Sequence, residues 1–172
     1  MREQMELAAL MPTIREVIDA GGAFRLYPRG KSMLPLLVEG EDSIELGAAE
    51  PYAVGDALLY RRKNGQFVLH RLIAVQKDGL VFCGDHQRDL EYGVPKSAVL
   101  AKMCGYYKGE AHHTVEEADY LRYTAERVAR FPWIFRKSKA AYNLYRRITP
   151  LHTLPRRAGH KLLRMLKIEK QK

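Results

Sequence analysis

The sequence predicts a small, mainly β fold: an antiparallel β domain with an N-terminal amphipathic helix and a C-terminal basic helical tail. Three observations predict it. The first 20 residues have helical periodicity, residues 23–110 consist of short β-type runs joined by tight turns, and the chain after Thr114 is rich in helix formers and positive charge. We therefore expect three parts, a helix over 1–22, a β domain over 23–110 and a basic tail over 111–172.

The N-terminal helix is predicted by apolar residues that recur every three or four positions. They are Met5, Leu7, Ala8, Leu10, Met11, Ile14, Val17 and Ile18. Gly21 and Gly22 follow them, as expected where a helix ends in a left-handed cap. This pattern indicates a packing helix of about 15–18 residues with one buried face.

The β domain is predicted by six short runs of strand-forming residues, which cover residues 23–27, 43–46, 57–61, 67–75, 80–83 and 98–107. Two of the connections carry hairpin signals, Lys63-Asn64-Gly65 and Lys77-Asp78-Gly79. Connections this short cannot make the crossovers of a parallel sheet. An antiparallel sheet or a small barrel is therefore expected.

The tail is predicted to form three helices, over Val115–Arg130, Ser138–Ile148 and Gly159–Lys170. It also carries the charge of the chain, which has 172 residues and a net charge of +9. Residues 1–110 hold 14 basic and 15 acidic side chains, whereas residues 111–172 hold 15 and 5. The net positive charge is thus confined to the tail, residues 111–172.

Several protein classes are disfavoured by composition. No apolar run reaches the ~18 residues that a membrane span needs, and the acidic N-terminal segment is unlike a secretory signal. We expect a cytoplasmic protein. Cys83 and Cys104 are too few for a disulfide scaffold and are interpreted as buried thiols. The histidines lack cysteines or carboxylates at ligand spacing, so no metal or other cofactor is expected.

A candidate nucleophile lies in the segment Gly30–Leu37 (GKSMLPLL), where Ser32 follows a glycine turn and precedes Pro35. The proline restricts its own φ and favours an extended residue before it, which can hold the serine hydroxyl exposed. A serine in such a turn is more often only a turn residue. Lys31 and Lys63 are conceivable bases, but Lys31 adjoins the serine on the opposite side and Lys63 lies at a hairpin tip.

A candidate base is His70, which lies within the apolar run Phe67–Val75. Strand alternation places it on one face with Val68 and Leu72, and places Arg71 on the other. A half-buried histidine needs hydrogen-bond partners, and a backbone carbonyl is the ordinary one.

Two Gly-Asp turns complete the pattern: Gly55-Asp56 and the segment Phe82–Asp89 (FCGDHQRD), with Asp85 and Asp89. In order, the segments GKSMLPLL, GDALLYRR, FVLHRLIAV and FCGDHQRD resemble the motifs of the signal-peptidase and self-cleaving-repressor superfamily of serine peptidases. The resemblance covers about residues 25–105. It implies a signal-peptidase-like β fold and a serine endopeptidase that cleaves a leader, signal or propeptide.

The resemblance also implies roles for individual residues. Ser32 matches the nucleophile, and its N–H with a donor near Gly30 would form the oxyanion hole. His70 stands at the position where bacterial members usually carry lysine. Members of the endoplasmic-reticulum and archaeal type carry histidine there, and this sequence resembles them. Asp89 best matches the carboxylate that orients this histidine. Asp85 is the alternative third member or a structural residue, and Asp56 is expected to be structural.

The chain also departs from this superfamily. From this sequence we expect neither the usual transmembrane anchor nor the lysine base and DNA-binding domain of the self-cleaving repressors. The expected partner is a peptide or preprotein substrate.

Residues 127–172, with 14 basic residues and one acid among aromatics, suit an anionic membrane surface. A solvated appendage is nearly as plausible an interpretation, nucleic-acid binding is less favoured, and a non-catalytic peptide- or membrane-binding protein on the same scaffold is the alternative to an enzyme.

Overall fold

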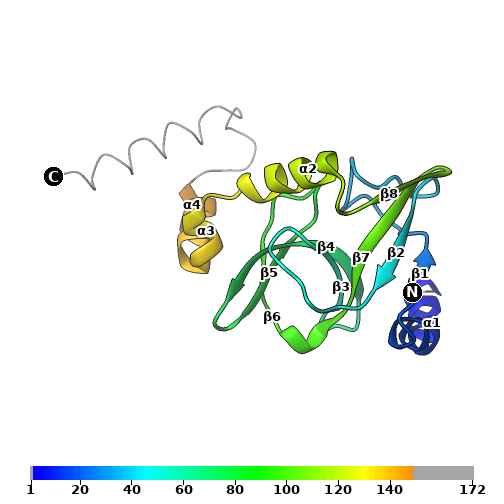
Figure 1. Cartoon of the computed structure of the whole chain (residues 1–172). Helices are drawn as coiled ribbons and strands as arrows, with labels where there is room; N and C mark the ends of the chain where they lie inside the picture. The colour runs from blue at the N-terminus through cyan, green and yellow to red at the C-terminus, as the bar shows by residue number, and fades with distance from the viewer. Residues whose placement is uncertain (1, 149–172) are drawn as a thin grey trace. The chain divides into compact units, whose positions relative to one another are not determined.

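The computed structural model describes residues 2–148 of the chain, which divides into two compact units (Figure 1). Unit 1 comprises Met1–Pro132 and unit 2 comprises Trp133–Lys172. Unit 1 is mainly antiparallel β, which confirms the predicted fold class. The sequence placed the end of the β domain at residue 110, whereas unit 1 continues to Pro132 and so includes one further strand and helix.

The N-terminal helix forms as predicted. Helix α1 (Arg2–Asp19) ends just before Gly21, which has φ of +80°. Met11 and Ile14, three positions apart, are buried in the main core of the β domain. The helix therefore packs through one face and leads directly into β1 (Phe24–Leu26).

The sheet has eight strands, all paired antiparallel, in the order β1-β2-β7-β3-β4-β5-β6, with β8 paired to β7. Beyond β1 the strands are β2 (Ser43–Gly47), β3 (Ala57–Arg61), β4 (Phe67–Gln76), β5 (Gly79–Cys83), β6 (Glu91–Val94), β7 (Val99–Lys108) and β8 (Ala111–Thr114); a short 3-10 helix, Lys96–Ala98, precedes β7. The six predicted runs correspond to β1–β5 and β7. Strands β6 and β8 have four residues each and were not predicted.

Two hydrophobic clusters lie on the two faces of the central strand β3. Ala57 and Leu59 belong to the larger cluster, which also receives α1. Leu58 and Tyr60 belong to the smaller cluster, together with residues of β4, β5 and β6. Because side chains alternate along a strand, this arrangement places Tyr60 on the same side of the sheet as the face of β4 that carries His70.

After the sheet, the described residues up to 148 are mainly helical. Helix α2 (Ala118–Ala129) belongs to unit 1, and the short helix α3 (Trp133–Lys137) and α4 (Lys139–Ile148) belong to unit 2. Two of these match predicted helices, and α3 was not predicted. The predicted helix over Gly159–Lys170 lies outside the described residues. None of the helices within 2–148 combines the length and apolar character needed to cross a membrane.

Candidate active site

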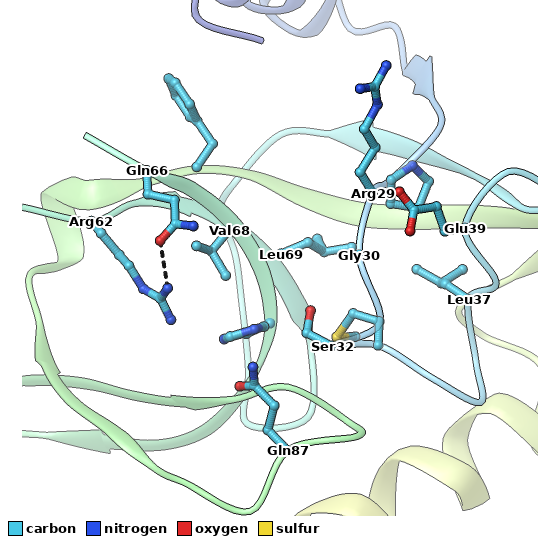
Figure 2. A pocket seen from close by; sticks show the side chains of 14 residues that line it. Arg29, Gly30, Ser32, Leu37, Glu39, Arg62, Gln66, Val68, Leu69 and Gln87 are labelled. Atoms are coloured by element: carbon cyan, nitrogen blue, oxygen red, sulfur yellow. Dashed lines mark hydrogen bonds between the residues drawn. The ribbon is translucent and has the colours of Figure 1, made fainter. Parts of the chain in front are cut away.

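Ser32 lies in a compact turn between β1 and β2. The turn is closed by a hydrogen bond from Leu37 N–H to Met33 O (3.1 Å), and both of these side chains are buried. These two apolar residues, which follow the serine, thus anchor the turn in the core. Ser32 itself stays partly exposed and borders a pocket of about 210 Å³. Figure 2 shows its hydroxyl pointing into this pocket, with the Gln87 side chain across from it.

The second Gly-Asp turn holds the serine turn in place. The carbonyl of Ser32 accepts a hydrogen bond from His86 N–H at 2.8 Å. At Gly84, a Cβ atom would lie 2.7 Å from the same carbonyl oxygen. The close approach of these two backbone segments therefore requires glycine at this position.

His70 lies in β4 and borders the same pocket as Ser32. Its side chain is buried, with 2% of the residue exposed. Its Nδ1 atom is 3.2 Å from the hydroxyl of Tyr60, which comes from the neighbouring strand β3. The ring is therefore fixed through Nδ1, which leaves Nε2 as the atom available for other chemistry.

Behind His70 lies a hydrogen-bonded chain of three residues. The Tyr60 hydroxyl donates to Glu91 Oε2 at 2.7 Å. Arg62 donates to both carboxylate oxygens of Glu91, at distances of 2.5–3.0 Å, and Nη1 of Arg62 also donates to Gln66 (Figure 2). Tyr60 is fully buried, whereas Arg62 and Glu91 are each about 30% exposed. The chain thus runs from the pocket to the surface.

The electrostatics of this cluster follow from burial and charge. Burial, and after it the positive charge of Arg62, lower the pKa of His70 to about 4, while the negative charges of Glu91 and Asp85 oppose this shift. Burial raises the pKa of Glu91, but hydrogen bonds from Arg62 and Tyr60 outweigh it, so that the pKa is lower than usual. Burial and Glu91 raise the pKa of Tyr60. At neutral pH the site therefore contains neutral imidazole, neutral phenol and ionised carboxylate.

Asp85 belongs to a different cluster of buried polar side chains. It forms two hydrogen bonds with Arg71, Nε–Oδ1 at 2.7 Å and Nη2–Oδ2 at 2.6 Å, and both side chains are completely buried. Arg71 also donates to the carbonyl of Gly55 at 2.6 Å. The two Gly-Asp turns are thus joined through Arg71, the residue next to His70.

Helix α2 completes this support. Tyr123 donates to Asp85 Oδ2 at 3.0 Å, and Thr124 accepts from Arg71 at 2.9 Å. Just after the helix, Arg130 donates to the carbonyls of Asp85 (2.8 Å) and Gln87 (3.0 Å). The predicted basic tail therefore contributes its first helix to the scaffold that holds the Gly84–Gln87 turn.

The remaining predicted residues have separate places. Asp89 is exposed and borders a second, open pocket that Arg62 and Glu91 also line. Its role as the carboxylate that orients His70 stays a prediction; the group on Nδ1 of His70 is the Tyr60 hydroxyl. Gly30 borders the Ser32 pocket with φ of +87°. Asp56 accepts a hydrogen bond from Ala53 N–H at 2.8 Å, consistent with the structural role expected for it.

Sequence reasoning missed Tyr60, Arg62 and Glu91. A signal existed for the first, because the hairpin at Lys63-Asn64-Gly65 pairs Leu58 with His70, which puts Tyr60 diagonally across from the histidine. No comparable local signal marks Glu91, since it lies in the short strand β6 and reaches Tyr60 only through the fold.

The cysteines take no part in this cluster. Cys83 and Cys104 are free thiols, and burial raises the pKa of Cys83 to about 12. Across residues 2–148, no group of three or more histidine, cysteine, aspartate or glutamate side chains is arranged to hold a metal ion. The pocket thus offers a hydroxyl and a neutral imidazole as its reactive groups.

No protein-family model and no curated protein matches the chain.

Proposed function

We propose that the protein is a serine endopeptidase that cleaves a leader, signal or propeptide, with Ser32 as nucleophile and His70 as general base. The observation that carries this proposal is that both residues border one pocket, one in a fixed turn and the other buried with a fixed ring. A serine hydroxyl becomes an effective nucleophile when a neighbouring base removes its proton. The lowered pKa of His70 keeps the imidazole unprotonated at neutral pH, as a base must be.

The reaction follows from these groups. Ser32 Oγ attacks the peptide carbonyl carbon while its proton passes to Nε2 of His70. That proton then passes to the leaving amine as the C–N bond breaks, leaving an acyl-enzyme. Water, deprotonated by the same imidazole, hydrolyses the ester and restores Ser32. In this proposal the backbone N–H of Ser32 and a donor near Gly30 stabilise the oxyanion, an effect worth ~10²–10³ in rate.

An extended peptide fits the sheet beside this pocket. Strand β5 pairs with β4 only from Arg71 to Gln76, while β3 pairs with β4 from Phe67 to Arg71. Residues Phe67–His70 therefore have a partner on one edge, and all four of them border the pocket. A peptide that adds as a strand along the free edge would bring its backbone to Ser32.

The test compares purified wild-type protein with Ser32→Ala on a proteome-derived peptide library, with new termini identified by mass spectrometry. We expect a set of cleavages with a shared sequence pattern that disappears in the variant. Ser97→Ala is the matched control, because Ser97 is exposed in the 3-10 helix and does not border the pocket. Cleavage that persists in Ser32→Ala, or no cleavage by the wild type, contradicts the proposal.

We also propose that residues 127–172 dock the enzyme on an anionic membrane surface. Unit 2 exposes two large apolar side chains, Trp133 (63%) and Leu144 (60%), in a segment whose charged residues are almost all basic. Aromatic and basic side chains together favour a lipid interface, with ~1 kcal/mol from each lysine or arginine near the surface. The protein should co-sediment with phosphatidylglycerol vesicles and not with phosphatidylcholine vesicles. Equal binding to both, or to neither, contradicts this.

A further inference from the structure

We propose that Tyr60 and Glu91 are the positioning residues for His70: Glu91 takes the Tyr60 proton, and Tyr60 in turn holds the imidazole proton on Nδ1. This inference deepens the proposed function and rests on it for its catalytic consequence. It assigns to a tyrosine–glutamate pair the task that the sequence assigned to Asp89. The basis is the hydrogen-bonded chain His70–Tyr60–Glu91–Arg62.

Counting protons along this chain determines the tautomer. Glu91 accepts up to four hydrogen-bond contacts from Arg62 and Tyr60, so its carboxylate is ionised and can only accept. Tyr60 has one hydroxyl proton, and at 2.7 Å from Glu91 Oε2 that proton is donated to the carboxylate. The Tyr60 oxygen must therefore accept from His70 at 3.2 Å, so the imidazole carries its proton on Nδ1. Nε2 is left as a lone pair, the form a general base requires.

The packing makes this arrangement rigid. The Tyr60 ring is fully buried and stacks on Phe82, with centroids 4.3 Å apart and planes 16° from parallel. Its hydroxyl is thereby fixed between the two partners. Glu91 begins β6 and pairs in register with the same Phe82. Because one phenylalanine positions both the phenol and the carboxylate, their distance is set by the sheet rather than by flexible side chains.

The charges around His70 show how the pair acts. The groups that act on the imidazole are Tyr60, by its hydrogen bond, and the charges of Arg62 next to β3, Glu91 of β6 and Asp85 of the turn after β5. The negative charge of Glu91 favours a protonated imidazole. Arg62, which is bound directly to Glu91, disfavours the protonated form. The two charges thus act on the pKa of His70 in opposite directions. The pair therefore acts mainly by selecting the tautomer and orientation of the ring, and less by stabilising its positive charge.

The experiment reads the tautomer directly, by ¹⁵N NMR of the histidine side chains in the full-length protein at pH 7, with His70→Gln used to assign the signal. We expect the wild type to carry the proton on Nδ1. Tyr60→Phe removes the acceptor and should lose this preference. Glu91→Ala frees the tyrosine proton to point at His70 and should move the imidazole proton to Nε2, whereas Glu91→Gln keeps an acceptor oxygen and should preserve the Nδ1 form.

Cleavage rates supply the second readout. Tyr60→Phe and Glu91→Ala should lower kcat at least about tenfold with little change in KM, within the ~10⁴-fold loss known for a catalytic histidine held in the wrong tautomer. Tyr107→Phe is the matched control, because it removes another tyrosine-to-glutamate hydrogen bond, to Glu45, away from the pocket. It should leave both readouts unchanged.

The outcomes separate this inference from the proposed function. If no Ser32-dependent cleavage exists, the proposed function fails, while the tautomer measurement still decides whether Tyr60 and Glu91 position His70. A wild-type proton on Nε2 overturns the inference. So does a Tyr60→Phe variant that keeps both the wild-type tautomer and the wild-type rate.

Discussion

Replacing Gly84 by alanine tests whether the second Gly-Asp turn positions Ser32. The new Cβ would lie 2.7 Å from the Ser32 carbonyl oxygen and 3.0 Å from the Gln87 side chain. An ordinary contact of this kind is about 3.4 Å or more, so the two backbone segments must separate by roughly 0.7 Å. This separation weakens the hydrogen bond between His86 N–H and the same oxygen, which is 2.8 Å long.

The expected effect is larger on catalysis than on stability. Overpacking at a tight backbone contact costs about 1–3 kcal/mol, or several degrees in Tm. A shift of almost 1 Å in the nucleophile, however, can reduce the rate by about 10²-fold, because attack requires close alignment with the substrate. We therefore expect Gly84→Ala to remain folded and to lose most peptide cleavage, with a kcat decrease that its modest loss of stability does not explain.

The assay combines thermal unfolding with cleavage of a peptide selected from the library. Gly47→Ala is the control, because a Cβ there meets only the Cys104 side chain, at 3.3 Å or more, and lies in β2 outside the pocket. It should change neither measurement by much. Wild-type kcat in Gly84→Ala would refute the reasoning, since the serine turn would then tolerate displacement from its anchor.

Two further predictions concern His70 and Asp85. The folded-state pKa of His70, about 4, lies below the ordinary 6.5, so the unfolded chain binds more protons between these values and stability falls on acidification. Urea titration should show about 2 kcal/mol less stability at pH 5 than at pH 7 from this group, and His70→Gln should remove that part; an unchanged pH dependence argues against a neutral buried imidazole. Asp85→Asn removes the charge opposite the buried Arg71 and should cost about 3–5 kcal/mol in urea unfolding. The exposed pair Arg122–Asp119 provides the comparison, because Asp119→Asn should change stability by less than about 1 kcal/mol, and equal effects would contradict the importance of burial.

The parts of the fold that the sequence predicted are those with local signals. Helix α1 has repeated apolar spacing and a terminal glycine, and β3–β4 are joined at Lys63-Asn64-Gly65. Both signals depend only on neighbours in the chain. They were sufficient to place His70 in a strand and to put Arg71 on the opposite face, as the structure shows.

The unpredicted parts depend on contacts that are distant in sequence. Strand β6 has four residues, with Gly93 at φ +71°, and it forms because Leu80 and Phe82 provide a pairing edge. Strand β8 follows the turn at Gly109 and pairs back onto β7 without apolar alternation of its own. The same limitation hid Glu91. Motif spacing predicts Asp89 as the carboxylate that orients His70, and it gives no sign that Glu91, two residues later, begins β6 and reaches Tyr60.

The adjacent residues His70 and Arg71 connect the proposed chemistry to its scaffold. Because their side chains leave β4 on opposite faces, the imidazole meets Tyr60 and the pocket, while the guanidinium meets Asp85. Asp85 belongs to the turn whose next residue binds the Ser32 carbonyl. One buried ion pair thus links the strand that carries the proposed base to the turn that holds the proposed nucleophile. Disrupting the Arg71–Asp85 pair would displace His70 and Ser32 together. We therefore expect Asp85→Asn to reduce cleavage even at temperatures where the variant remains folded.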